Sequence, residues 1–563
     1  MGKIVRDGCP LLSRRDFVKL GGASLAGAGL LGLTGCGGEE TISGGSQEGG
    51  GSVFTYAQGL DVLSLDPPNQ ADDTSSAVAS YIFDTLLQYP LEGAELAPWL
   101  AAEVPEPDDR GRSYTFTLRE GVEFHDGTPF NAEAVIFNFE RWRDTSNPYH
   151  KGGGSQSSDF SNYALLFGGF DDESVITDVR ALDDVTVRFE LSYPLGSFLA
   201  NLAETSFAMT SPEAVRKNVE EFWKNPVGTG PFRFDSWEIG SRLSLKKNAS
   251  WWGGSVPVSE GGSGPHLNKV IFQPIPDNTS RVAALTGGNV TAADGIVPDD
   301  LPAIQEDPDL KVLYRPPLTS GYLTMNSRKE PFGDVRVRRA VAHAIDVPEI
   351  VESFFAETGE VASGPMSSGL SFFNADLEPY GYDLAESKRL LEDAGFPDGF
   401  ETDLWYIPIP RPYMPDGKGI AQAMQQDLEK VGIRAKLVTY EFAAYLEKLG
   451  TGEHSMALYG GTDVGVDPDF RLNYWFNSAA ATETAATNVS FYENPEVDRL
   501  LLQARRSVDP DRRREFYYRV QEMLHEDVPV VPLAYVRPPI GLQERVEGYT
   551  ITYGGDRLNT VRL

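Results

Sequence analysis

The chain has 563 residues, of which 41% are apolar, and this length exceeds the size at which one hydrophobic core usually stops growing. We therefore expect two or three subdomains. The formal net charge of −33 argues against binding nucleic acid or anionic lipid headgroups through a basic surface.

The N-terminal residues predict an export signal. Ser-Arg-Arg-Asp-Phe-Val-Lys at 13–19 resembles a twin-arginine signal, which exports proteins that are already folded. The apolar run at 20–33 is shorter than the roughly 20 residues that cross a bilayer, but it fits the core of a signal peptide. Leu-Thr-Gly-Cys at 33–36 resembles a lipobox. We expect residues 1–35 to be removed as a signal peptide and Cys36 to be lipidated.

Cysteine usage is sparse. The two cysteines are Cys9 and Cys36, of which cleavage would remove the first and lipidation would use the second. The mature protein would then have no thiol for a disulfide, a zinc ligand or a nucleophile. Residues 36–51 are polar and rich in glycine, which predicts a flexible tether with an end-to-end distance of roughly 20 Å.

From residue 53 onward, strand-like runs alternate with helix-like segments. Alternation of polar and apolar residues predicts half-buried strands, and Asn131 stands where a helix N-cap is expected. The expected strands are 53–57, 113–118 and 185–191, the expected helices are 76–87 and 131–143, and further elements include 335–344, 384–394 and 419–431. This mixture, without heptads or repeats, indicates an α/β architecture.

Five blocks of sequence carry a resemblance to a known family. They are Ser-Tyr-Thr-Phe-Thr-Leu-Arg-Glu-Gly-Val-Glu-Phe-His-Asp-Gly-Thr-Pro-Phe at 113–130, Pro-Val-Gly-Thr-Gly-Pro-Phe at 226–232, Met-Asn at 325–326 with Pro-Phe-Gly-Asp-Val-Arg-Val-Arg at 331–338, Asp-Pro-Asp at 467–469 and Asp-Val-Pro at 527–529. In this order they resemble the extracellular solute-binding proteins of family 5, the peptide and nickel receptors of ATP-driven importers. Their order and spacing span almost the whole mature chain.

The resemblance implies an α/β, bilobed fold of the periplasmic-binding-protein-like type II, in its large, cluster C-like form. Lobe one would comprise 52–318 and 532–563, with an extra subdomain at about 98–205, and lobe two would comprise 319–531. Both crossings carry prolines, at 315–317 and 529–532, and are expected hinges. Such proteins work by hinge closure, in which the ligand bridges the lobes and stabilises the closed state.

Two segments resemble the dipeptide-binding branch of this family. Arg-Pro-Tyr-x-Pro begins at Arg411, and the resemblance implies that this arginine grips the peptide carboxylate. In the segment 460–469, the resemblance implies that Asp463 pairs with the peptide amino group. The chemistry agrees, because a buried zwitterion needs a partner at each end and the planar guanidinium can donate two parallel hydrogen bonds. The structural alternative is that Arg411 is a surface arginine in a proline-rich loop and that Asp463 is a helix cap or a turn residue.

Several further residues are candidates for the ligand site. Asp463 stands one residue further from Asp-Pro-Asp than in the dipeptide receptors, so Asp467 is the alternative partner of the amino group. Gly460 belongs to the same segment, and Tyr413 and Tyr459 either line a side-chain pocket or belong to the core. Two acidic residues of lobe one, Asp72 and Asp73, are either solvated surface or favour cationic ligands.

The sequence thus predicts a lipid-anchored substrate-binding protein of an ABC importer that captures short peptides and delivers them to the permease. The alternatives are a receptor for an oligosaccharide, an opine or a nickel chelate, and an exported enzyme. No GxSxG, HExxH or Walker motif appears, and the six histidines have no zinc-like spacing. We expect a monomer without catalytic residues, metal or cofactor, held by its lipid on the extracellular or periplasmic face of the membrane.

Overall fold

The computed structural model describes residues 52–563 except 70–71, 92 and 152–159. Residues 51–563 form one compact unit. The predicted signal peptide, the lipobox with Cys36 and the glycine-rich tether lie outside the described residues. Within the described part of the chain, no helix is long and apolar enough to span a membrane.

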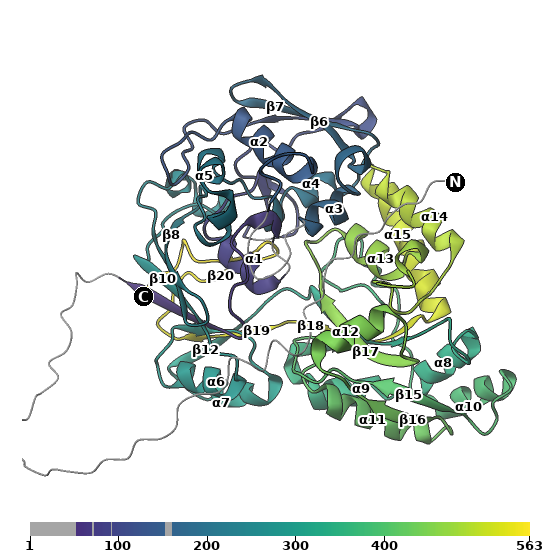
Figure 1. Ribbon diagram of the computed structural model, residues 1–563. Helices are drawn as coiled ribbons and strands as arrows, with labels where there is room; N and C mark the ends of the chain where they lie inside the picture. The colour runs from purple at the N-terminus through teal and green to yellow at the C-terminus, as the bar shows by residue number, and fades with distance from the viewer. Residues whose placement is uncertain (1–51, 70–71, 92, 152–159) are drawn as a thin grey trace, which may run out of the picture. The chain divides into compact units, whose positions relative to one another are not determined.

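The first lobe is built on a seven-stranded mixed sheet with the order β12-β19-β11-β1-β10-β9-β8 (Figure 1). β1 runs parallel to β10 and β11, and its Phe54 and Tyr56 are buried, as the alternation in the sequence predicts. The strands are β1 (Val53–Gln58), β8 (Phe232–Glu238), β9 (Arg242–Lys247), β10 (Lys269–Pro274), β11 (Ala292–Ala293), β12 (Leu310–Tyr314) and β19 (Pro539–Gln543), and the helices of this lobe include α1 (Asp73–Ala79), α5 (Pro212–Lys217), α6 (Asn278–Thr286) and α7 (Leu301–Gln305).

The second lobe is built on a six-stranded mixed sheet with the order β14-β18-β13-β17-β15-β16. All residues of β13 and β18 are buried, which is typical of strands covered on both faces. The strands are β13 (Thr319–Met325), β14 (Gly359–Val361), β15 (Glu401–Trp405), β16 (Arg434–Val438), β17 (Met456–Thr462) and β18 (Val530–Val536), and the helices are α8 (Val335–Ala344), α9 (Val347–Phe354), α10 (Leu384–Asp393), α11 (Gly417–Glu429) and α12 (Phe442–Gly450).

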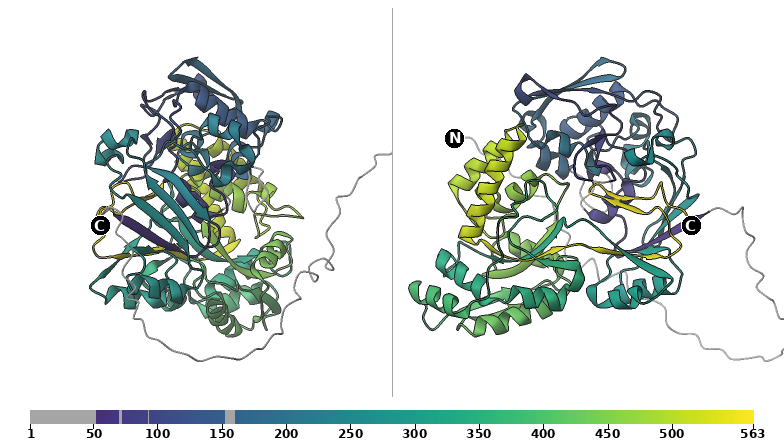
Figure 2. Two further views of the ribbon diagram at one scale, coloured as in Figure 1. Left: turned by 60° about the vertical axis from the view of Figure 1, so that its left-hand side comes forward. Right: turned by 180° about the vertical axis from the view of Figure 1, so that it is seen from behind.

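The chain passes between the two sheets twice, at 315–318 and at 537–538. In Figure 2 the yellow C-terminal segment runs from the second lobe into the first. The return lies later than the expected residue 532, because β18 continues through Pro532. A proline lacks the N–H that a central strand needs and is tolerated at a bulge. The register of β13 against β18 shifts between Gly321 and Tyr322, where Tyr322 faces Pro532.

The region expected as an extra subdomain contains a four-stranded antiparallel sheet with the order β4-β5-β7-β6. Its elements are β4 (Pro107–Asp108), β5 (Ser113–Thr117), α2 (Ala132–Arg143), α3 (Ser161–Phe167), β6 (Ile176–Asp183), β7 (Thr186–Leu191) and α4 (Phe198–Asn201). The Asn131 side chain accepts a hydrogen bond from the Ala134 N–H at 3.1 Å, which confirms the predicted N-cap.

The helix expected at 76–87 is wrong in its extent, since α1 ends at Ala79. The buried residues Tyr81 and Ile82 that extend the apolar pattern lie in a loop, where their carbonyl groups accept hydrogen bonds from the N–H groups of Phe232 and Gly230. These two residues are buried by contacts with a distant segment of the chain and not because they lie on the inner face of a helix. Short strand pairs complete this lobe: β2 (Leu87–Gln88) with β3 (Ala97–Pro98), and β20 (Thr550–Thr552) with β21 (Gly555–Arg557).

Three helices of the second lobe, α13 (Pro468–Phe476), α14 (Pro495–Arg505) and α15 (Pro510–Asp527), share one hydrophobic core with the four-stranded subdomain of the first lobe. Leu501 and Val520 belong to this core together with Phe189 and Phe198. The Gly196 N–H also donates a hydrogen bond to the carbonyl oxygen of Arg505 at 2.7 Å. The two lobes are therefore in contact.

Candidate functional site

The segment 411–415 lies against two strands of the second lobe at a pair of glycines. Gly321 of β13 and Gly460 of β17 are cross-strand partners. A Cβ at Gly460 would lie 2.6 Å from the ring of Tyr413, and a Cβ at Gly321 would come within 3.0 Å of the Tyr413 carbonyl oxygen. The absence of side chains at both positions lets this segment approach the sheet.

Arg411 is held in this segment by its backbone and by one aromatic ring. Its N–H and carbonyl groups pair with those of Met414 at 3.1 and 2.9 Å. The guanidinium lies over the ring of Phe442, 4.3 Å from its centroid. Its Nε is buried and has no hydrogen-bond partner among the described residues. Arg411 is therefore a positioned cation with a free donor.

Asp73, at the start of α1 in the first lobe, lies within electrostatic range of Arg411 in the second. Burial raises the pKa of Asp73, the neighbouring Asp72 raises it further, and Arg315, Arg411 and a hydrogen bond with Thr462 lower it. Asp72 instead caps α1, since its carboxylate accepts hydrogen bonds from Ser75. Asp73 and Arg411 thus influence each other electrostatically from different lobes, whereas Asp72 has a local role.

Asp463 is buried and paired within its own lobe. Only 8% of the residue is exposed, and its Oδ1 accepts a hydrogen bond from Nε of Arg471. Among the described residues, Asp463 Oδ2 and Arg471 Nη1 are buried without hydrogen-bond partners. The Arg471 guanidinium lies 3.8 Å from the ring centroid of Trp475. The Oδ2 atom of Asp463 is therefore an unused acceptor, which could accept a hydrogen bond from an ammonium group.

Sequence reasoning missed Arg471. It lies eight residues after Asp463, beyond a loop and inside α13, and no motif at this spacing signals an ion pair. The contact forms because the loop turns back along the helix.

Asp467, the alternative partner of an amino group, has both carboxylate oxygens engaged. Arg513 donates to them at 2.7 and 2.8 Å, and the Asp469 N–H donates at 3.0 Å, which makes Asp467 the N-cap of α13. Asp469 is in turn paired with Arg505 at 2.9 Å. These contacts give Asp467 a structural role that fixes the start of the helix.

The two tyrosines are placed differently. Burial raises the pKa of Tyr413 to about 12, with Arg411 lowering it and Asp73 raising it, so Tyr413 lies near both charges. Tyr459 packs between aromatic rings, with its centroid 5.4 Å from that of Trp475 and 5.9 Å from that of Tyr322. Tyr413 therefore belongs to the boundary between the lobes, whereas Tyr459 packs within lobe two.

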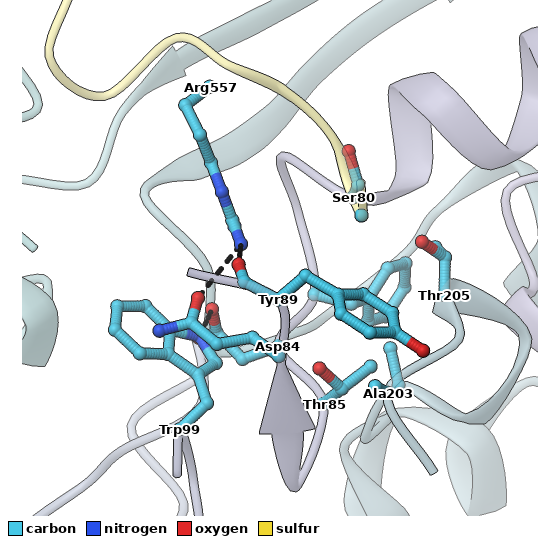
Figure 3. Close-up of a pocket in the computed structure, with 12 residues that line it drawn as sticks. Ser80, Asp84, Thr85, Tyr89, Trp99, Ala203, Thr205 and Arg557 are labelled. Carbon is cyan, nitrogen blue, oxygen red and sulfur yellow. Dashed lines mark hydrogen bonds between the residues drawn. The ribbon is translucent and has the colours of Figure 1, made fainter. Parts of the chain in front are cut away.

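Two small polar cavities lie within the first lobe, with volumes of about 30 and 10 Å³. Figure 3 shows the larger one, with Arg557 and Asp84 on its wall. Arg557 donates a hydrogen bond to the side chain of Gln88 at 2.8 Å. Asp84 on its wall accepts from Trp99 at 2.7 Å. A water needs roughly 10–15 Å³ of such space, so these cavities have room for no more than one or two waters each. Neither cavity has room for a peptide.

Gly321→Ala tests how the segment 411–415 is positioned. The new Cβ meets the backbone of Tyr413, which cannot rotate away, so the segment should shift and ligand affinity should fall by about tenfold. Isothermal titration calorimetry measures the affinity. Gly381→Ala is the matched control, because a Cβ there has no atom within 4 Å. Equal affinities of the two variants would show that the approach at Gly321 is unimportant.

Comparison with known proteins agrees with this architecture. Residues 95–483 match the family model described as bacterial extracellular solute-binding proteins, family 5 Middle. The chain is 31% identical over 489 residues to the dipeptide-binding protein of Escherichia coli strain K12, covering 85% of this chain and 88% of that protein. It is 30% identical over 512 residues to heme-binding protein A of Haemophilus influenzae, covering 88% and 90%.

A solved structure extends the comparison to three dimensions. The periplasmic binding protein DppA from Helicobacter pylori, in complex with the peptide STSA, superimposes with a TM-score of 0.76 at 31% identity. The match covers 91% of this chain and 98% of that one.

Proposed function

Since the chain belongs to the bacterial extracellular solute-binding proteins of family 5, we propose that it serves an ABC importer and binds short peptides between its two lobes. The observation that carries this proposal is Arg411, a cation with a free buried donor that lies within electrostatic range of Asp73 of the other lobe. Relatives that are named as peptide-binding proteins, and one solved with a bound peptide, support it.

The proposed binding mode uses both charged ends of the peptide. Arg411 would donate from Nε and its terminal nitrogens to the carboxylate, since a guanidinium matches the two oxygens of that group. The free Oδ2 of Asp463 would accept from the ammonium. Tyr413 would pack beside the carboxylate end, and main-chain hydrogen bonds would leave the ligand side chains less constrained.

Binding would be coupled to the relative position of the lobes. The chain crosses between them at 315–318 and 537–538, and these short connections are the proposed hinges. A ligand that touches both lobes binds the closed form more tightly and shifts the population toward it. The importer would then distinguish the loaded receptor from the empty one by its shape.

The wider setting follows the sequence prediction. We propose export by the twin-arginine route, lipidation at Cys36 and retention at the outer face of the membrane, beside the permease. The protein would act as a monomer without catalysis, because solute-binding relatives capture their ligands without chemical change.

A thermal-shift screen tests the ligand class. A ligand that binds the native state raises the free energy of unfolding, by about 2.7 kcal/mol when its concentration is 100 times Kd. The melting temperature rises as a result. The purified protein would be screened against dipeptides, tripeptides, oligosaccharides, opines, nickel chelates and hemin. We expect dipeptides or tripeptides to stabilise it. A response to a sugar, a chelate or hemin, with none to any peptide, would overturn the proposal.

A further inference from the structure

Glu204 of the first lobe reaches the loop of the second lobe that carries Asp463. It follows α4, and its carboxyl group lies against Gly465, where a Cβ would be 3.0 Å from its Cδ. Gly465 has a φ of +66°, in the left-handed region that favours glycine. The chain therefore keeps this position without a side chain, and the carboxyl group of Glu204 fills the space.

The carboxyl group of Glu204 has no cation beside it. Burial alone raises its pKa, to about 8, and among the described residues its side chain forms no hydrogen bond or ion pair. Tyr89 lies within electrostatic range of it and is neutral, because burial raises the pKa of the Tyr89 hydroxyl.

The other acidic groups of this region differ from Glu204. Asp463, Asp467 and Asp469 are paired with Arg471, Arg513 and Arg505 respectively, so the protein itself neutralises each of them. Glu204 has no such partner, and its carboxyl group stays neutral at pH 7 by keeping its proton. A ligand cation that reaches it can take the place of that proton.

The position of Glu204 places it beside the proposed peptide site. Thr462 contacts Asp73, and Gly465 contacts Glu204 three residues later. Three residues span at most about 11 Å, so Glu204 and the pair of Asp73 and Arg411 lie along one short segment of the second lobe. Asp463, the proposed partner of the ligand ammonium, stands between them in sequence.

We infer that Glu204 determines specificity by binding a cationic side chain of the ligand, so that the protein favours peptides with a basic residue near the amino end. This inference rests on the proposed peptide-binding function. Charge-assisted hydrogen bonds from an ammonium or guanidinium to Glu204 would add to those made at the two peptide termini.

Titration calorimetry with Ala-Ala and Lys-Ala tests this inference on the wild-type protein and on Glu204→Gln, which removes the charge at constant size. We expect the wild type to bind Lys-Ala at least tenfold more tightly than Ala-Ala, and Glu204→Gln to lose that preference while its affinity for Ala-Ala stays within about twofold. Glu133→Gln, an exposed carboxylate of the same subdomain, is the control and should retain the preference.

A second measurement separates ligand binding from a purely structural role. With a pKa near 8, the carboxyl group of Glu204 holds a proton at pH 7, and a cation that binds it would displace that proton. Calorimetry in two buffers of different ionisation enthalpy should show proton release when Lys-Ala binds to the wild type. Fewer protons should be released when Lys-Ala binds to Glu204→Gln. The same is expected when Ala-Ala binds to either protein.

The outcomes distinguish this inference from the proposed function. Wild-type binding of Ala-Ala without a preference for Lys-Ala, or a preference that survives in Glu204→Gln, would overturn the role of Glu204 and leave the peptide receptor intact. Binding of neither peptide, with a response to another solute class, would overturn both. Equal weakening of both peptides by Glu204→Gln would assign Glu204 to lobe packing and overturn its role in specificity.

Discussion

Arg411→Ala is expected to weaken binding of a free dipeptide by about 100-fold, or roughly 3 kcal/mol, because it removes one partner of a desolvated charge pair. The fold should be little affected, since the guanidinium stacks on Phe442 from a half-buried loop and exposed contacts of this kind contribute about 0.5–1 kcal/mol. Titration calorimetry measures the affinity and thermal melting checks the fold.

A peptide with an amidated C-terminus provides the matched control for Arg411. If Arg411 binds the carboxylate, the amide should bind the wild type weakly, and the Arg411→Ala substitution should cost little more for that ligand. Arg411→Lys keeps the charge but loses the planar fork, so an intermediate affinity is expected. If Arg411→Ala weakens the acid and the amide equally, Arg411 does not contact the carboxylate.

Arg141→Ala is expected to destabilise the protein by about 3–5 kcal/mol, because it leaves Asp66 buried without its charge partner. Arg141 of α2 donates to Asp66 at 3.0 Å, and both side chains are at most 1% exposed. Its other nitrogens donate to the carbonyl oxygens of Tyr149 and Lys151 at 2.9 and 2.8 Å. This single side chain therefore ties the four-stranded subdomain to the body of the first lobe.

Urea or thermal unfolding measures this loss, and two further variants control for it. Arg389→Ala breaks an exposed pair with Glu386 and should cost less than about 1 kcal/mol. In the double variant Arg141→Met with Asp66→Leu, no unpaired charge remains, so it should be more stable than Arg141→Ala. A double variant as unstable as Arg141→Ala would assign the loss to packing rather than to the unpaired carboxylate.

Local features of the fold are predictable from the sequence where neighbours in the chain carry the signal. The alternation in β1 and the N-cap at Asn131 are both found in the structure, because each depends on residues a few positions apart. Where tertiary contacts compete, the local pattern misleads. The apolar residues Tyr81 and Ile82 extend a helical period but bind the segment 228–232. Pro532 resembles a strand end but lies beside a bulge in β18 itself, at Leu533.

The candidate site also contains features that the sequence predicts and features that only the fold creates. Arg411, Tyr413 and Gly460 could be selected from the sequence, because a motif and its chemistry single them out. Their convergence could not, since Gly321 and Gly460 lie far apart in the chain and meet only as cross-strand partners. The ion pairs that engage Asp463 and Asp467 also form only after the helices have packed.

By itself, the sequence determined the α/β class, the family to which the chain belongs and the residue types available to a peptide, because ordered blocks and local periodicity are properties of neighbours. Only the tertiary structure decided which charges remain available. Burial and the positions of arginines distant in the chain engage Asp467 and leave one oxygen of Asp463 unused. They also leave Glu204 without a cation at the boundary between the lobes. Charge availability depends on what surrounds a group in space, which no single segment of the sequence specifies.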